Sequence, residues 1–177
     1  MVDYLIWRSG EFSHGRILPS KGDERKKIGY EGAETLVNIG LIRWTYPVAM
    51  RMGFAKGELI LEIGYGADCD DALRAEIKKI VATDFHENST NEVVDAVLLW
   101  FRDGDGDLVD ELMDAMAYLS ETGPIWVLTP KVGRDGHVEP SDIQDAAPTC
   151  GLSQTSTLVV AQDWTATRLV ARKAGKR

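Results

Sequence analysis

The clearest candidate for a binding site is a glycine-containing turn between a predicted strand and a predicted helix. The strand ELILEIG (58–64) runs directly into GYGAD (64–68), and a helix follows. Gly64 and Gly66 let the backbone approach a ligand closely, while the first turn of a helix offers free amide donors. The alternative is a tight strand-to-helix connection in which the two glycines supply backbone angles and nothing binds.

An acidic residue further along the chain fits the same chemistry. Asp84 lies 22 residues after Glu62, at the end of a candidate strand, VATDF (81–85). An acid at about this distance commonly accepts hydrogen bonds from ribose hydroxyls. If VATDF instead continues the preceding helix, Asp84 is only a loop acid.

A second group of candidate residues lies in the loop KVGRDGHVEP (131–140), which follows a predicted strand. Lys131 and Arg134 are expected to neutralise an anionic ligand above an acidic sheet edge, and His137 can exchange a proton near neutral pH. The alternative is a solvated connection that bends at its glycines.

The string RDGDGDLVDELMD resembles a calcium-binding loop at Asp103, Asp105 and Asp107. Its sixth position is Leu108, where the sharp turn of such a loop needs glycine, and its twelfth is Asp114 in place of the usual bidentate Glu. We therefore predict no metal site here.

Alternating strands and helices position these candidates. Apolar runs predict strands, and apolar residues at spacings of 3 and 4 predict helices, with Asp68 or Asp70 capping the first helix and Asp107 the second. The predicted strands are 58–64, 81–85, 93–101 and 124–130, the helices 67–80, 107–119 and 140–151, and the final hairpin 154–162 with 164–172. This alternation predicts an α/β fold, a shortened Rossmann-like and mainly parallel sheet with flanking helices and a C-terminal antiparallel hairpin.

The charge is unevenly distributed along the chain. Residues 1–56 hold 9 basic and 6 acidic side chains, whereas residues 57–177 hold 11 basic and 22 acidic ones. Such an acidic body repels a phosphate backbone, so nucleic acid is not expected as a partner. Glycine and proline interrupt residues 1–45, which we interpret as a poorly ordered or loosely docked extension; residues 46–172 form the domain and residues 173–177 a basic tail.

Composition also limits the cellular setting. No apolar run approaches the roughly 18 residues that a membrane span needs, and the opening MVDYLIWRSGEF lacks the features of a signal peptide. Cys69 and Cys150 have no partner at zinc-finger spacing and are interpreted as reduced thiols. We expect a cytoplasmic protein without a membrane partner.

LEIGYGA resembles the first motif of class I S-adenosylmethionine-dependent methyltransferases, and VVDAVLLWF and the terminal hairpin resemble later strands of that family. The resemblance implies that S-adenosylmethionine is a possible cofactor. It places Glu62, Gly64 and Gly66, with Tyr65 between them, against that cofactor, and Asp84 at its ribose. The sequence departs from the family where only 11 residues separate Asp84 from Asp95, too few for a full helix and the third strand.

A more specific resemblance covers residues from about 50 to 172. It is carried by AVLLWFRDGDGDLVDELMDA, IWVLTPKVGRDGHVEPSDIQDAAPTCGLSQTS and DWTATRLVA. These strings are similar to the bacterial family known as domain of unknown function 3052. That resemblance implies a fold and no activity.

Three functions are compatible with these patterns. The favoured one is a non-catalytic binding or regulatory domain for a nucleotide-like metabolite or a protein partner. The second is a compact methyltransferase, which needs little side-chain chemistry because it works mainly by positioning the acceptor. The third is an interaction module whose acidic helix (107–119) meets a basic partner.

Overall fold

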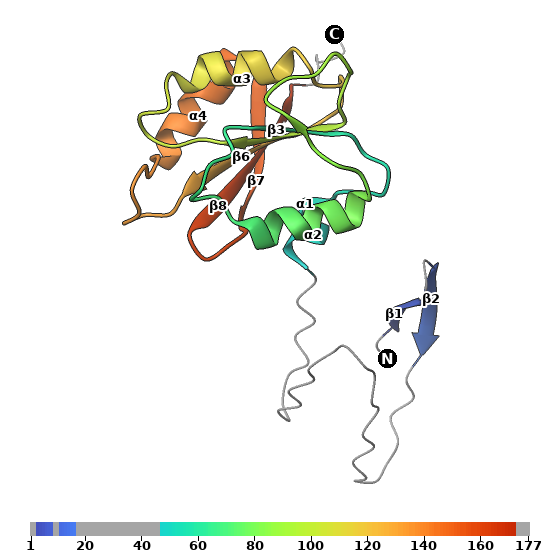
Figure 1. The fold of residues 1–177 in the computed structure, drawn as a ribbon. Helices are drawn as coiled ribbons and strands as arrows, with labels where there is room; N and C mark the ends of the chain where they lie inside the picture. Colours follow the sequence, from blue (N-terminus) through green and yellow to red (C-terminus); the bar gives the residue numbers. More distant parts are fainter. Residues whose placement is uncertain (1–2, 9–10, 17–46, 173–177) are drawn as a thin grey trace. The chain divides into compact units, whose positions relative to one another are not determined.

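The computed structural model describes residues 3–8, 11–16 and 47–172 (Figure 1). The chain divides into two compact units, Met1–Ile42 and Arg43–Arg177. In the first unit, β1 (Asp3–Arg8) and β2 (Glu11–Arg16) form an antiparallel hairpin that the sequence analysis did not predict. The predicted boundary at residue 45 and the basic tail lie outside the described residues.

The second unit contains one six-stranded sheet in the order β4-β3-β5-β6-β8-β7. The strands β4, β3, β5 and β6 are parallel, β8 runs antiparallel to β6, and β7 and β8 form an antiparallel hairpin. The bounds are β3 (Ile60–Ile63), β4 (His86–Glu87), β5 (Ala96–Trp100), β6 (Ile125–Pro130), β7 (Leu152–Val159) and β8 (Trp164–Ala171). The predicted fold class, a mainly parallel sheet that ends in an antiparallel hairpin, is confirmed.

Helices cover both faces of this sheet, as Figure 1 shows. One face packs against α1 (Val48–Met52) and α2 (Asp71–Val81), and the other against α3 (Leu108–Met116) and α4 (Pro140–Thr149). The central strands β5 and β6 are buried on both faces, which is why they read as continuous apolar runs. No helix among the described residues is long and apolar enough to cross a membrane.

The predicted caps fix the starts of two helices. The Asp70 side chain accepts a hydrogen bond from the Leu73 amide at 2.7 Å, and Asp107 accepts one from the Val109 amide at 2.8 Å. Each cap satisfies an amide that has no partner within its helix. Both helices therefore start directly after strand-end loops, where their first turns can contribute to a site.

The second predicted strand is wrong in position. Helix α2 runs to Val81 and ends at Ala82, which adopts a left-handed conformation with φ 58°, and the strand β4 occupies only His86–Glu87. Asp84 therefore precedes β4 instead of ending it. Between β4 and β5, residues 88–95 contain no further helix or strand, in agreement with the short spacing seen in the sequence.

Candidate functional site

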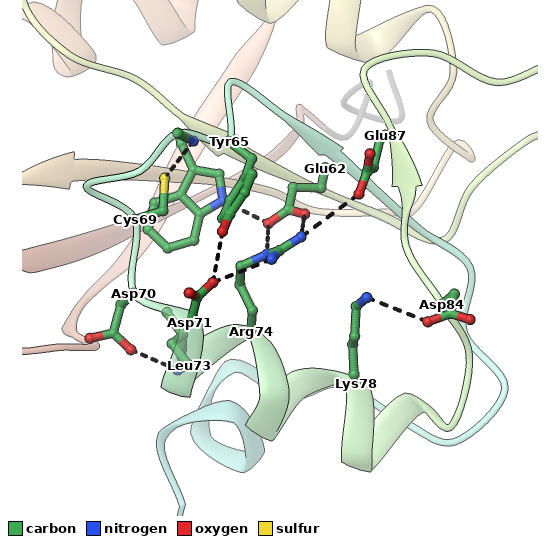
Figure 2. A network of polar contacts seen from close by, with 12 residues as sticks. Glu62, Tyr65, Cys69, Asp70, Asp71, Leu73, Arg74, Lys78, Asp84 and Glu87 are labelled. Carbon is green, nitrogen blue, oxygen red and sulfur yellow. Dashed lines mark hydrogen bonds and ion pairs between the residues drawn. The ribbon is translucent and has the colours of Figure 1, made fainter.

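A buried carboxylate lies at the end of β3, where the sequence predicts a site. Arg74 of α2 donates to both oxygens of Glu62, from Nε to Oε1 at 2.8 Å and from Nη2 to Oε2 at 2.6 Å (Figure 2). The indole of Trp100 on β5 donates to Oε1 at 3.0 Å. The Glu62 side chain is 0% exposed and that of Arg74 is 15% exposed. These contacts join β3, α2 and β5, and they occupy both oxygens of Glu62.

Tyr65 covers Arg74 at the surface. The Arg74 guanidinium lies 3.7 Å from the centre of the Tyr65 ring, and the Tyr65 hydroxyl donates to Asp71 Oδ1 at 2.8 Å. The hydrogen bonds from Arg74 to Glu62 raise the pKa of the guanidinium, and the hydrogen bond to Asp71 raises the pKa of Tyr65. Tyr65 is 43% exposed, so it remains available to solvent at the edge of the site.

Gly64 and Gly66 are each required in the turn, but for different structural reasons. Gly64 adopts φ +73°, and a Cβ there would collide with the backbone carbonyl oxygen of Trp100. At Gly66, a Cβ would lie 2.9 Å from Asp68 Oδ1 and 3.3 Å from Arg102 Nη2. Gly64 therefore allows close packing of neighbouring strands, while Gly66 makes room for two side chains of the protein itself.

Arg102, which follows β5, covers the glycine turn. It forms a two-bond pair with Asp68, at 2.7 and 2.6 Å, and Nη1 donates to the Gly64 carbonyl at 3.0 Å. The hydrogen bond from Arg102 lowers the pKa of Asp68. The Trp164 indole donates to the Asp68 carbonyl at 3.1 Å, and its ring lies 5.1 Å from the Arg102 guanidinium. This contact ties the turn to the C-terminal hairpin.

A cavity of about 430 Å³ remains outside this cluster, at the carboxyl ends of β3 and β5. Gly64, Tyr65 and Arg102 line it together with Asn88 and Glu111. Burial, together with the charges of neighbouring Asp residues, raises the pKa of Glu111. A hydroxyl or amino group that enters the cavity can donate a hydrogen bond to the Glu111 carboxylate.

The nearest thiol is not activated as a nucleophile. Cys69 Sγ accepts from the Gly66 amide at 3.2 Å and from Arg102 Nη2 at 3.1 Å. Burial nevertheless raises the pKa of the Cys69 thiol, and nucleophilic attack requires the thiolate. Cys69 thus supports the turn.

Comparison with known proteins agrees with this architecture. The family model described as "Protein of unknown function (DUF3052)" matches residues 49–173. The chain belongs to the DUF3052 family. Two relatives, the uncharacterized proteins Rv2239c of Mycobacterium tuberculosis (strain ATCC 25618 / H37Rv) and Mb2263c of Mycobacterium bovis, are each 50% identical over 131 residues, which is 73% of this chain and 82% of theirs.

Solved structures place the DUF3052 fold among methyltransferase-like folds. A SAM dependent methyltransferase from Aquifex aeolicus matches with a TM-score of 0.51 and 13% identity, over 69% of this chain and 86% of its own. The O-methyltransferase NcsB1 from neocarzinostatin biosynthesis matches with a TM-score of 0.52 and 11% identity over 72% of this chain. The DUF3052 chain spans 51% of NcsB1, about half its length. At these identities the similarity shows the fold alone.

Of the residues that the methyltransferase resemblance places against a cofactor, Gly64, Tyr65 and Gly66 line the cavity, and Glu62 does not. The Glu62 carboxylate accepts hydrogen bonds from Arg74 and Trp100, and the Asp68 and Arg102 side chains fill the space beside Gly66. Asp84 is 97% exposed and pairs with Lys78 at 3.4 Å. The structure therefore does not bring Asp84 to the cavity in the DUF3052 chain.

Glu87, the last residue of β4, is an acid near the site that the sequence analysis missed. Glu87 Oε1 lies 3.9 Å from Arg74 Nη2, and Asn88 directly after it lines the cavity. The sequence could have pointed to Glu87 as an acid that ends a strand. The sequence analysis placed that strand at 81–85 instead, because the two residues of β4 are too few to show a pattern.

The cations of the loop after β6 are engaged elsewhere. Lys131 donates to the carbonyls of Ala161 and Gln162 at 2.8 and 2.7 Å, and Arg134 pairs with Asp163. His137 Nδ1 lies 2.9 Å from the Pro130 carbonyl oxygen, which places a donated proton on Nδ1. Lys131 and Arg134 hold the loop against the turn between β7 and β8, and none of the three residues lines the cavity beside the glycine turn.

Two acids of the calcium-like string also have other partners. Asp105 Oδ2 accepts from the Arg102 amide at 2.9 Å, and Asp107 caps α3. Within the described parts of the DUF3052 chain, no group of three or more His, Cys, Asp or Glu is arranged to hold a metal ion.

Proposed function

We propose that this DUF3052 protein is a non-catalytic, cytoplasmic binding domain that holds a nucleotide-like metabolite by its nucleoside part. The site is the cavity at the carboxyl ends of β3 and β5. One observation carries the proposal. The charged side chains nearest the glycine turn pair with one another, Arg74 with Glu62 and Arg102 with Asp68, whereas Asn88 and Glu111 line an open cavity of about 430 Å³.

The chemistry of the cavity favours a ligand rich in hydroxyl and amino donors. The Glu111 side chain has no hydrogen-bond partner among the described residues, so its oxygens can accept from a ligand donor. Asp105 also lines the cavity, and the two carboxylates disfavour a phosphate close to them. Exposed Tyr65 supplies an aromatic edge for a base.

A compact methyltransferase is the second candidate, and the methyltransferase-like fold favours it. S-adenosylmethionine itself contains a nucleoside, so both functions predict binding of adenosine. They differ in the methionine part, for which a methyltransferase needs room next to the nucleoside, whereas Asp68 and Arg102 fill the space beside Gly66. A third candidate, a protein partner that carries basic residues, is suggested by the acids Asp110 and Asp114 on α3.

The test is calorimetric titration of the full chain with adenosine. The proposal predicts saturable binding that weakens about tenfold in Glu111→Ala, because one charge-assisted hydrogen bond is lost. Glu121→Ala is the matched control, since Glu121 is exposed and does not line the cavity, and it should bind like the unchanged protein. Absence of heat at millimolar adenosine, or equal weakening by both variants, would refute the proposal.

A further inference from the structure

A cavity of about 450 Å³ lies beside α4, over the strands β6, β8 and β7. Val138 and Ile143 form its buried apolar side, and both belong to the core on the α3 and α4 face of the sheet. Val132 and Val159 also line it, although they are 81% and 60% exposed. None of these residues lines the cavity of the proposed nucleoside site, so this cavity is a separate feature.

Four threonines from the three strands line the same cavity. Thr129 on β6 lies opposite Thr165 on β8. Thr167 on β8 lies opposite Thr157 on β7. Side chains two residues apart on a strand point to the same face of a sheet, and Val127, two residues before Thr129, belongs to the core that α4 covers. The Thr129 side chain therefore points to the face over which the cavity lies.

Thr129 carries a hydroxyl group that the protein leaves open to this cavity. The residue is 5% exposed, and its Oγ1 has no hydrogen-bond partner among the described residues. This oxygen is not one of the unpaired polar atoms that the described residues seal from solvent. Thr167 is equally buried, but its Oγ1 lies 3.4 Å from that of Thr157. The Thr129 hydroxyl is thus a buried polar group that a ligand in the cavity can reach.

Lys131 and His137, the two ionisable side chains of the lining, are turned to backbone carbonyls. Lys131 Nζ donates to Ala161 and Gln162, and His137 Nδ1 lies 2.9 Å from the Pro130 carbonyl oxygen. Among the described residues, no Asp or Glu lines this cavity. The groups open to a ligand are therefore hydroxyls and apolar side chains. They suit a neutral molecule, because an ion would lose hydration without gaining a charged partner.

We infer that this cavity binds a neutral, mainly apolar molecule that carries a hydroxyl group, with Thr129 Oγ1 as the hydrogen-bond partner of that group. A hydroxyl both donates and accepts, so an alcohol or a phenol can pair with a threonine hydroxyl in either direction. The apolar body of the ligand would cover Val132 and Val159, and removing apolar surface from water favours binding.

The first test is a titration of 4-fluorophenol with the full chain at pH 7, followed by ¹⁹F spectra, with 4-fluorobenzoate in a separate series. The inference predicts saturable binding of the phenol that is tighter than binding of the benzoate, because only the benzoate must give up the hydration of a charge. Absence of saturable binding at millimolar phenol, or tighter binding of the benzoate, would overturn the inference.

Thr129→Val tests the hydroxyl directly, since it removes the oxygen and keeps the shape of the side chain. It should weaken binding of 4-fluorophenol about fivefold, the loss for one hydrogen bond between neutral groups, and leave unchanged the binding of 4-fluorotoluene, which has no hydroxyl. Thr129→Ser keeps the hydroxyl and should bind 4-fluorophenol like the unchanged protein.

Thr122→Val is the matched control, because Thr122 is exposed and does not line the cavity, and it should leave both titrations unchanged. If Thr129→Val weakens 4-fluorophenol and 4-fluorotoluene equally, or if the two valine variants weaken 4-fluorophenol equally, the Thr129 hydroxyl is not the contact and the inference is overturned.

Discussion

Removal of the Arg74 side-chain charge should be the most damaging single change at the glycine turn. In Arg74→Met the carboxylate of Glu62, which is 0% exposed, loses both of its guanidinium bonds and keeps only the indole of Trp100. A buried charge left without its partner costs about 3–5 kcal/mol. This is a large share of the roughly 5–15 kcal/mol by which a domain is stable.

The assay is urea unfolding followed by tryptophan fluorescence, for which Trp100 is a local reporter. With a slope of about 1–3 kcal/mol per M urea, the midpoint should fall by roughly 2 M. The slope itself should be unchanged if the variant keeps the native fold. Lys79→Met on the same helix is the matched control, because Lys79 is exposed, and its midpoint should stay close to that of the unchanged protein.

A double variant separates the orphaned charge from lost packing. Glu62→Gln with Arg74→Met removes both charges, so it should be more stable than Arg74→Met alone. If Arg74→Met costs less than about 1 kcal/mol, or if the double variant is the less stable of the two, then the Glu62–Arg74 pair is not the element that fixes the turn.

Three further predictions concern single positions. Gly64→Ala should destabilise the domain by more than about 1 kcal/mol, measured by urea unfolding, because the new Cβ meets the Trp100 carbonyl oxygen at a positive φ; an unchanged midpoint would contradict the packing described. Asp70→Ala should cost about 1 kcal/mol, since the Leu73 amide loses its cap, and Asp70→Asn should restore most of it. Glu111→Gln should stabilise the protein at pH 7, because the folded state raises the pKa of Glu111 and so disfavours its charged form. This gain in the free energy of unfolding should vanish as the pH falls below about 4.3, where Glu111 is protonated in the unfolded state as well. A gain that does not depend on pH would refute this cause.

The framework of the domain was predictable because local signals specify it. The strands β5 and β6 appear as apolar runs, α3 shows apolar spacings of 3 and 4, and Asp70 and Asp107 have the side chains that helix caps need. Gly64 and Gly66 mark the turn correctly. Each of these features depends on residues close in sequence, so one sequence is enough to show them.

The contacts that define the site were not predictable in the same way. Arg74 reaches Glu62 across 12 residues, and Arg102 reaches Asp68 across 34. Nothing in a single sequence couples such pairs. Lys131 shows the same limit, because its hydrogen bonds to the carbonyls of Ala161 and Gln162 depend on a hairpin turn about 30 residues further along the chain.

The most direct test of the proposed function compares two ligands in one calorimetric series on the unchanged full chain. Adenosine and S-adenosylhomocysteine share the nucleoside, and only the second carries the methionine part. Because Asp68 and Arg102 fill the space beside Gly66, the account predicts dissociation constants within about tenfold of each other. S-adenosylhomocysteine binding more than about 100-fold tighter than adenosine would contradict it and establish a cofactor site of the methyltransferase kind.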